Sequence, residues 1–242
     1  MASSRLLSFL LLSLLVIFIY PSNSSPENNV TEAQSHIRFK KASLSLYYEA
    51  LCPYCRSFIV SRLVKVFNTD LLNIINLRLV PWGNAEYVKT NKTIICQHGE
   101  DECYLNTIHA CAINIWPDPR KHFNFIYCVE NQGPDGTDAV WKTCSSTLGM
   151  DQKLIKNCYD SGYGRKLLLR YATETDDLHP KHSYVPWVTV NNQPLYDQYE
   201  NFIAYVCNAY KDKSWVKACL SRSLNATEEK SAISKRSHNG GK

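Results

Sequence analysis

The sequence predicts an α/β fold whose elements run β-α-β…β-β-α, with a cysteine-rich helical insertion in the middle of the chain. Three observations predict it. An alternating strand pattern, a Cys-x-x-Cys motif and a helical pattern follow one another in residues 43–67. A second strand pattern follows at residues 74–80, and a late hairpin with a final helix occupies residues 185–210. Between these two halves the strand patterns fade and helical patterns carry the intervening cysteines.

The first strand alternates in polarity, so that Leu44, Leu46 and Tyr48 share one face, as in a half-buried strand. The helix that follows has these apolar residues on one face: Ile59, Leu63, Val66 and Phe67. Cys52 and Cys55 therefore lie between a strand and the start of a helix. In that position a Cys-x-x-Cys pair is typical of a thioredoxin-like redox site.

The position of the two cysteines assigns their roles. Only a thiolate attacks a disulfide, and unpaired N–H groups at a helix N-terminus stabilise negative charge there. We therefore expect Cys52 to be the nucleophile and Cys55, one turn further in, to be the resolving thiol. Pro53 suits the first helical turn, where a missing N–H costs little. The alternatives for the pair are a structural disulfide and half of a zinc site.

The strand at residues 74–80 completes a βαβ unit after a helix that we expect to end near Asp70. The insertion, at about residues 85–175, is predicted to contain helices and no strands. Its helices are expected at residues 102–116, 119–130, 138–148, 151–160 and 165–173. Asp151 is a candidate N-cap, and Gly162 and Gly164 are expected to break the chain between the last two helices.

The late hairpin turns at Asn191-Asn192, and a helix over residues 201–210 follows it. In thioredoxin-like folds the strand that enters this hairpin begins with a cis-proline beside the redox cysteines. We therefore predict a cis Val185-Pro186 bond, although most X–Pro bonds are trans. Val185 and Pro186, together with Pro53 and Tyr54, are the candidate substrate-binding residues.

The N-terminus has the features of a secretory signal peptide. Arg5 precedes an apolar run of about 15 residues, which is short for a membrane span of about 20. We expect a signal peptide at residues 1–24, a polar lead-in or propeptide at 25–41, one domain at 42–220 and a disordered polar tail at 221–242. Three sequons predict glycosylation, at Asn29, Asn91 and Asn225.

Charge and cysteine content limit the partners. The net charge of +5 is spread without a basic block, so we expect no nucleic-acid partner, and no later segment is apolar enough for a membrane span. Ten cysteines suit an oxidising compartment. Eight of them are expected to form structural disulfides: Cys96, Cys103, Cys111, Cys128, Cys144, Cys158, Cys207 and Cys219. Their connectivity is open, although the short Cys207–Cys219 spacing favours that pair. The even count gives no reason to expect a dimer through a spare cysteine, so we expect a monomer.

A second cluster spans residues 96–111 and contains three cysteines and two histidines. Three cysteines with His98 are also a possible zinc-ligand set. The secretory context favours disulfides instead, and we expect no metal. His98 and His109 are candidate proton carriers, but we assign them a structural role.

This cluster reads Cys-Gln-His-Gly-x-x-Glu-Cys-x-x-Asn-x-x-x-x-Cys and resembles the signature of the gamma-interferon-inducible lysosomal thiol reductase family at every fixed position. The resemblance covers about residues 44–220 and includes the upstream Cys52 and Cys55. It implies a thioredoxin-like domain that reduces disulfides in protein substrates at acidic pH, with Cys52 and Cys55 as the redox pair. The central Pro53-Tyr54 departs from the small residues of the mammalian enzymes and is the pair that glutaredoxins carry.

We therefore expect a thiol-disulfide oxidoreductase of the secretory pathway, either extracellular or in a lysosome or vacuole. No bound cofactor is expected, but a thiol electron donor is needed. Two alternatives remain. One is an oxidase or isomerase, because a low thiolate pKa also makes a cysteine pair oxidising. The other is a non-catalytic secreted module with Cys52 and Cys55 permanently bridged.

Overall fold

The structure is a computed structural model that describes residues 39–133 and 136–221. The predicted signal peptide, most of the lead-in, nearly all of the tail and the sequons at Asn29 and Asn225 lie outside these residues. No helix among the described residues is both long and apolar enough to cross a membrane.

A four-stranded mixed sheet in the order β2-β1-β5-β6 forms the centre of the fold. β1 (Ala42–Tyr48) pairs in parallel with β2 (Ile75–Pro81) and antiparallel with β5 (Trp187–Val190), and β5 pairs antiparallel with β6 (Gln193–Pro194). Leu44, Leu46 and Tyr48 are fully buried, as predicted for one face of β1, but Ser45 and Tyr47 on the other face are buried too, so the strand is covered on both faces and is not half-buried. Together with the helices described below, this topology confirms the thioredoxin-like α/β fold with its helical insertion.

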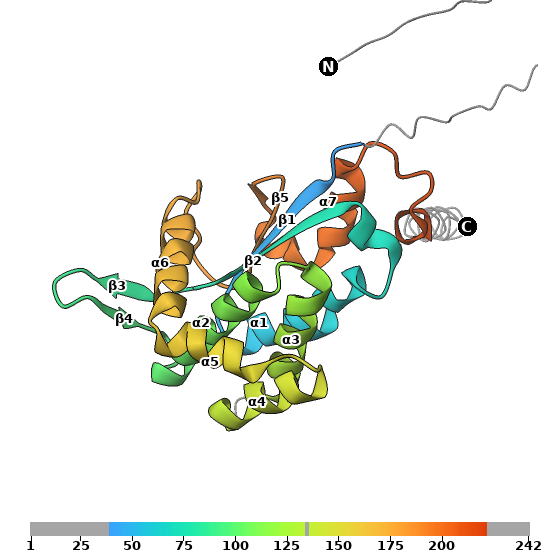
Figure 1. Ribbon diagram of the computed structural model, residues 1–242. Coiled ribbons are helices and arrows are strands. Elements are labelled where there is room, and N and C mark those ends of the chain that lie inside the picture. Colours follow the sequence, from blue (N-terminus) through green and yellow to red (C-terminus); the bar gives the residue numbers. More distant parts are fainter. Residues whose placement is uncertain (1–38, 134–135, 222–242) are drawn as a thin grey trace, which may run out of the picture. The chain divides into compact units, whose positions relative to one another are not determined.

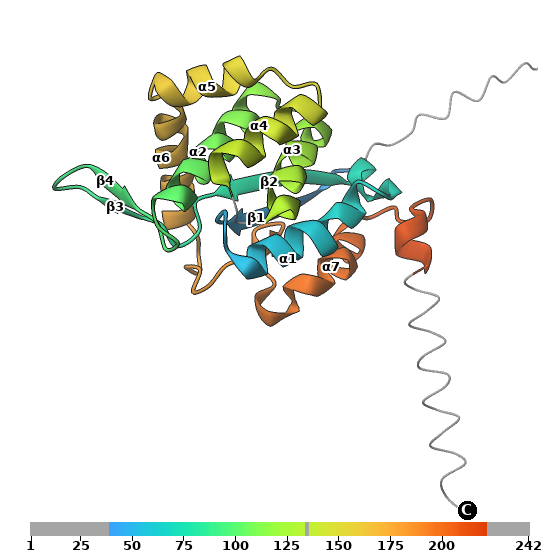
Figure 2. The same cartoon turned by 90° about the horizontal axis from the view of Figure 1, so that it is seen from below.

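Helices cover both faces of the sheet (Figures 1 and 2). α1 (Pro53–Ser61) and α7 (Phe202–Ala209) lie on one face, where α7 packs against β1 and β5. The helices between β2 and β5 lie on the other face, where α2 and α6 pack against β2. These helices are α2 (Glu100–Ile115), α3 (Pro119–Gln132), α4 (Thr137–Thr147), α5 (Gln152–Asp160) and α6 (Tyr163–Asp176).

Two expectations about local structure are wrong. The insertion contains a hairpin of β3 (Glu86–Val88) and β4 (Thr93–Ile95), which projects from one end of the molecule (Figure 1). Its strands have three residues each, too few for an alternating pattern to stand out. The first helix ends at Ser61, and two 3-10 turns, Leu63–Val66 and Asp70–Asn73, replace its expected continuation. Leu63 and Val66 in the first turn and Leu71 and Leu72 in the second are still buried, which explains why this stretch matched a helical pattern.

Gly164 does not break the chain as expected but lies within the first turn of α6. A Cβ atom at this position would come within 2.7 Å of Cys111 Sγ and of Thr107 Cγ2. Gly164 therefore allows α6 to pack closely against α2, which is a tertiary requirement that a local reading of glycine misses. The predicted N-cap at Asp151 is confirmed, because its side chain accepts a hydrogen bond from Lys153 N–H at 2.8 Å.

Four disulfides brace the helices. Three lie in the insertion, namely Cys96–Cys103, Cys111–Cys158 and Cys128–Cys144. The fourth, Cys207–Cys219, is the pair that the spacing favoured. The zinc alternative for the cluster at residues 96–111 is wrong, because its three cysteines are all bridged and none is left as a thiolate ligand.

Candidate active site

Cys52 and Cys55 lie where the chain passes from β1 into α1. Cys52 is the N-cap of α1, and its sulfur accepts a hydrogen bond from the Cys55 backbone N–H at 3.3 Å. Pro53 occupies the first helical turn. Both cysteines are free, with exposed fractions of 4% for Cys52 and 0% for Cys55. The pair is thus placed at a helix N-terminus, where a thiolate is stabilised.

The surroundings of the two sulfurs separate their pKa values. A hydrogen bond from the Cys55 thiol, with further help from the backbone N–H groups of Cys55 and Tyr54, lowers the pKa of Cys52 to about 6. Burial raises the pKa of Cys55 well above its ordinary value, and its hydrogen bond to Cys52 adds to this effect. Cys52 is therefore the better nucleophile and Cys55 stays a protonated thiol until it is needed, in agreement with the roles expected from the sequence.

The size of the pKa shift of Cys52 determines how much thiolate remains at acidic pH. An ordinary cysteine with a pKa near 8.5 is roughly 0.01% thiolate at pH 4.5. A pKa of about 6 for Cys52 leaves about 3% thiolate at that pH, a gain of roughly 300-fold. The site thus keeps a usable nucleophile under conditions that silence an ordinary thiol.

The loop before Cys52 is anchored from two sides. The Ala50 backbone N–H donates to Asn106 Oδ1 on α2 at 2.8 Å. The Asn84 backbone N–H, in the turn after β2, donates to Glu49 Oε2 at 2.7 Å. Gly83 makes this approach possible, because a Cβ there would lie 2.3 Å from Glu49 Oε2 and its φ is +61°. The loop that delivers the nucleophile is therefore fixed by the turn after β2 and by α2.

Glu49 belongs to a small charged cluster. His98 Nδ1 lies 2.8 Å from Glu102 Oε2 and 3.5 Å from Glu49 Oε1, and both carboxylate side chains have an exposed fraction of 0%. Burial raises the pKa of Glu49 to about 7 and also raises that of Glu102. The ligand atoms of these three residues lie within 4.8 Å of one another, so the chemistry suits a cation. Backbone N–H groups and the imidazole already partner the carboxylates, however, and we interpret the group as a hydrogen-bonded cluster.

The Val185-Pro186 bond is cis, as predicted. Trp187 pairs with Tyr47, so Pro186 lies at the carboxyl end of β1, the same end of the sheet from which the Cys52 loop leaves. Of the other candidate substrate-binding residues, Pro53 is exposed and Tyr54 has an exposed fraction of 70%. The register thus brings the cis-proline and the redox motif to one edge of the molecule.

The chain is similar to known proteins in both sequence and structure. The sequence profile described as "Gamma interferon inducible lysosomal thiol reductase (GILT)" matches residues 43–148. The gamma-interferon-responsive lysosomal thiol protein of Arabidopsis thaliana is 46% identical over 185 residues, which are 75% of this chain and 76% of that protein. The chain belongs to the GILT family. The gamma-interferon-inducible lysosomal thiol reductase of Mus musculus is 36% identical over 182 residues, covering 74% of this chain and 71% of that one.

Solved structures agree on the fold. DsbA of Chlamydia trachomatis superposes with a TM-score of 0.54 at 12% identity and covers 70% of this chain and 86% of its own. BdbD of Bacillus subtilis gives 0.51 at 11% identity, with 69% and 86% covered. Together with the GILT membership, the fold makes this chain a thiol-disulfide oxidoreductase. The non-catalytic module considered from the sequence is therefore set aside.

Sequence reasoning missed two buried acids at this GILT site, Glu49 and Glu130. Burial raises the pKa of Glu130 to about 8, and its Oε1 has no hydrogen-bond partner among the described residues. Glu130, on α3, also lines a cavity of about 130 Å³ beside Leu51 and Pro53. Glu49 interrupts an apolar stretch of sequence between Tyr48 and Ala50, and Glu130 directly follows one that ends at Val129. An acid within or directly after an apolar stretch is the one signal that marks these two positions.

The two histidines of the signature lie in different surroundings. His109 is buried on α2, where its Nδ1 lies 3.2 Å from Tyr48 Oη, and burial lowers its pKa to about 3. It is a neutral core residue, in line with the structural role expected for it. His98 instead reaches the cluster at the nucleophile's loop, with 31% of its side chain exposed.

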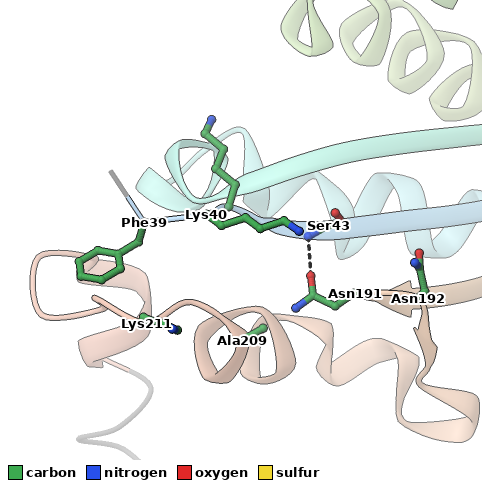
Figure 3. Close-up of a pocket in the computed structure, with 8 residues that line it drawn as sticks. Phe39, Lys40, Ser43, Asn191, Asn192, Ala209 and Lys211 are labelled. Atoms are coloured by element: carbon green, nitrogen blue, oxygen red, sulfur yellow. Dashed lines mark hydrogen bonds between the residues drawn. The ribbon is translucent and has the colours of Figure 1, made fainter. Parts of the chain in front are cut away.

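Other features lie away from the redox site. A cavity of about 550 Å³ is lined by Phe39, Lys40 and Lys211 and by Ser43 at the start of β1, where Ser43 N–H donates to Asn191 Oδ1 at 2.9 Å (Figure 3). It opens at the sheet end opposite to Cys52. The sequon Asn91 is exposed in the turn of the β3–β4 hairpin, where a glycan has room.

Proposed function

We propose that this protein reduces disulfide bonds of other proteins at acidic pH, in a lysosome-like or extracellular destination of the secretory pathway. The observation that carries the proposal is the asymmetry of the pair: the pKa of Cys52 is lowered to about 6 while that of Cys55 is raised. The similarity to gamma-interferon-inducible lysosomal thiol reductases of Carassius auratus and Mus musculus supports it.

The reaction balances without a bound cofactor. The Cys52 thiolate attacks one sulfur of the substrate disulfide, and the other substrate sulfur leaves and takes up a proton. Cys55 then gives up its proton and attacks the Cys52 sulfur, which releases the second substrate thiol and leaves a Cys52–Cys55 disulfide. An external thiol donor supplies the two electrons and two protons that restore the reduced pair.

The substrate is held at the edge where the redox motif and the cis-proline meet. Val185, as the residue before Pro186, offers its backbone to an extended segment of the substrate. Tyr54 projects into solvent beside the nucleophile and provides an apolar contact for an unfolded chain. This arrangement suits disulfides in unfolded or flexible protein segments.

An oxidase or isomerase is the second candidate. A very acidic nucleophile makes a pair oxidising, as in DsbA with a pKa of about 3.5, whereas the reductase thioredoxin has about 7. A value of about 6 for Cys52 lies closer to the reductase, which favours reduction as the direction.

The test is reduction of a denatured disulfide-bonded protein by the secreted, glycosylated protein at pH 4.5 and at pH 7.4. We expect Cys52-dependent turnover at pH 4.5 when a thiol donor is present. Turnover confined to pH 7.4 would contradict the acid assignment and favour the oxidase or isomerase.

A further inference from the structure

The signature motif that marks the family meets the active-site loop in space. His98 lies against Glu49, and Asn106 Oδ1 accepts the Ala50 N–H. Resting on the proposed function, we propose that His98 is a positioning residue for Cys52: its ring bridges two buried carboxylates and holds a positive charge toward the thiolate.

The bridge runs through a single ring atom, His98 Nδ1, which lies near a carboxylate oxygen of each acid. Glu102 Oε2 accepts the His98 backbone N–H at 2.7 Å and lies 2.8 Å from His98 Nδ1, while Asn106 Nδ2 donates to Glu102 Oε1 at 3.3 Å. Glu102 is thereby locked in place on α2. The remaining contact, His98 Nδ1 to Glu49 Oε1 at 3.5 Å, is the one ion-pair contact of that oxygen, which has no hydrogen bond among the described residues. His98 thus connects a fixed acid on α2 with a second acid three residues before the nucleophile.

The charges of His98, Glu49 and Glu102 determine how the cluster affects the Cys52 thiolate. Two carboxylates with side chains fully removed from water share one imidazole, and burial of unpaired charge is costly. The Cys52 thiolate is a third negative charge in the same region. The positive ring of His98 stabilises that thiolate, whereas an ionised Glu49 opposes it.

Three other titratable groups also interact electrostatically with Cys52. They are Cys55 on α1, Glu130 on α3 and Tyr199 in the 3-10 turn before α7. Because the pKa of Glu49 is raised to about 7, chiefly by burial, Glu49 is protonated and neutral at acidic pH. Below about pH 6 the opposing carboxylate charge at residue 49 is therefore largely absent from the cluster.

A purely structural role for His98 predicts something different. If the ring only held the loop, removing His98 and removing the charge of Glu49 would both loosen the loop and impair Cys52 in the same direction. If the cluster acts by charge, removing His98 lowers the thiolate fraction of Cys52, whereas removing the charge of Glu49 does not. This difference between the two variants is the basis of the test.

The experiment measures the rate of iodoacetamide alkylation of Cys52 between pH 4 and pH 8 in the reduced, full-length protein. For the wild type, the rate is expected to rise with pH around a midpoint near 6. In His98→Gln, which keeps a hydrogen-bond donor and loses the charge, the midpoint is expected to move up, but by less than a full pH unit, because the hydrogen bonds to Cys52 contribute more to its lowered pKa. For an upward shift of about half a unit, the thiolate fraction at pH 5 falls about threefold. The greater intrinsic reactivity of a more basic thiolate reduces this to a roughly twofold slower rate.

Two further variants and a control complete the series. Glu49→Gln removes only the charge of the minor ionised fraction of Glu49 near pH 6, so its midpoint is expected to lie at or slightly below that of the wild type. His98→Lys retains a positive charge and is expected to lie closer to the wild type than His98→Gln does. Glu100→Gln removes an exposed charge from the first turn of α2, the helix that carries Glu102, and should leave the alkylation midpoint of Cys52 unchanged.

Shifts of the same sign in His98→Gln and Glu49→Gln would overturn the proposal, as would an unchanged midpoint with a lowered thermal stability. If His98→Gln fails to fold, the comparison of Glu49→Gln and His98→Lys with the wild type decides in the same way. Alkylation uses no protein substrate, so these outcomes stay independent of whether the protein reduces disulfides. Failure of the reductase assay would leave an alkylation shift intact.

Discussion

Replacing Cys52 by serine is expected to lower the reduction of protein disulfides at least about 10³-fold. A serine hydroxyl at the N-cap still accepts a backbone hydrogen bond, so the helix is kept, but it does not ionise at any working pH. The lowered pKa of Cys52, which gives the site its nucleophile, has no counterpart in this variant. Turnover of a denatured disulfide-bonded protein at pH 4.5 measures the loss.

Ser57→Ala is the matched control, because Ser57 is exposed on the same helix. It should retain near wild-type turnover. More than a tenth of wild-type activity in Cys52→Ser would show that another group carries the reaction.

The second large effect concerns stability. Replacing both Cys111 and Cys158 by alanine is expected to lower the free energy of unfolding by about 4 kcal/mol, because this bridge closes the longest loop of the four. The two cysteines are 47 residues apart in sequence and join α2 to α5. Urea denaturation of the oxidised protein measures the change.

The matched control is the double alanine variant of Cys207 and Cys219. That bridge spans 12 residues, so the same chain-entropy argument gives about 3 kcal/mol. A smaller loss for Cys111 and Cys158 than for this control would contradict the ordering. It would mean that packing around α2 holds the insertion without the bridge.

The sequence predicted well those parts of the fold that depend on neighbours along the chain. The existence of β1, the start of α1 at Pro53 and the turn at Asn191-Asn192 are each encoded within a few residues, whereas the burial of both faces of β1 depends on helices from distant parts of the chain. The cis bond before Pro186 was predictable because the order of elements placed this proline at the entry of the late hairpin.

Other parts depend on contacts between distant segments. The Cys111–Cys158 and Cys128–Cys144 bridges join α2 with α5 and α3 with α4, and no local pattern gives the relative positions of these four helices. Gly164 was predicted to end a helix because its neighbour in space, Cys111, is 53 residues away in sequence. Their contact appears only when α6 packs on α2. The β3–β4 hairpin was missed because its strands are so short.

The residues of the candidate site were likewise predicted where their signal is local and missed where it depends on packing. Cys52 and Cys55 were found from their motif, since a short pattern between a strand and a helix specifies their chemistry. The cluster around His98 was not found, because Glu49 and Glu102 are 53 residues apart in sequence and meet only when α2 packs behind the loop. A buried acid in an apolar stretch is a weak signal until its partner is known.

Trapping the mixed disulfide tests directly whether Cys52 is the nucleophile and Cys55 the resolving thiol. Cys55→Ser is incubated at pH 5 with a denatured disulfide-bonded protein, and the products are analysed by non-reducing mass spectrometry. We expect a covalent adduct through Cys52 that a reductant releases and that the Cys52→Ser, Cys55→Ser double variant does not form. Absence of an adduct, or an adduct through another cysteine, would contradict the assignment of Cys52 as nucleophile and Cys55 as the resolving thiol.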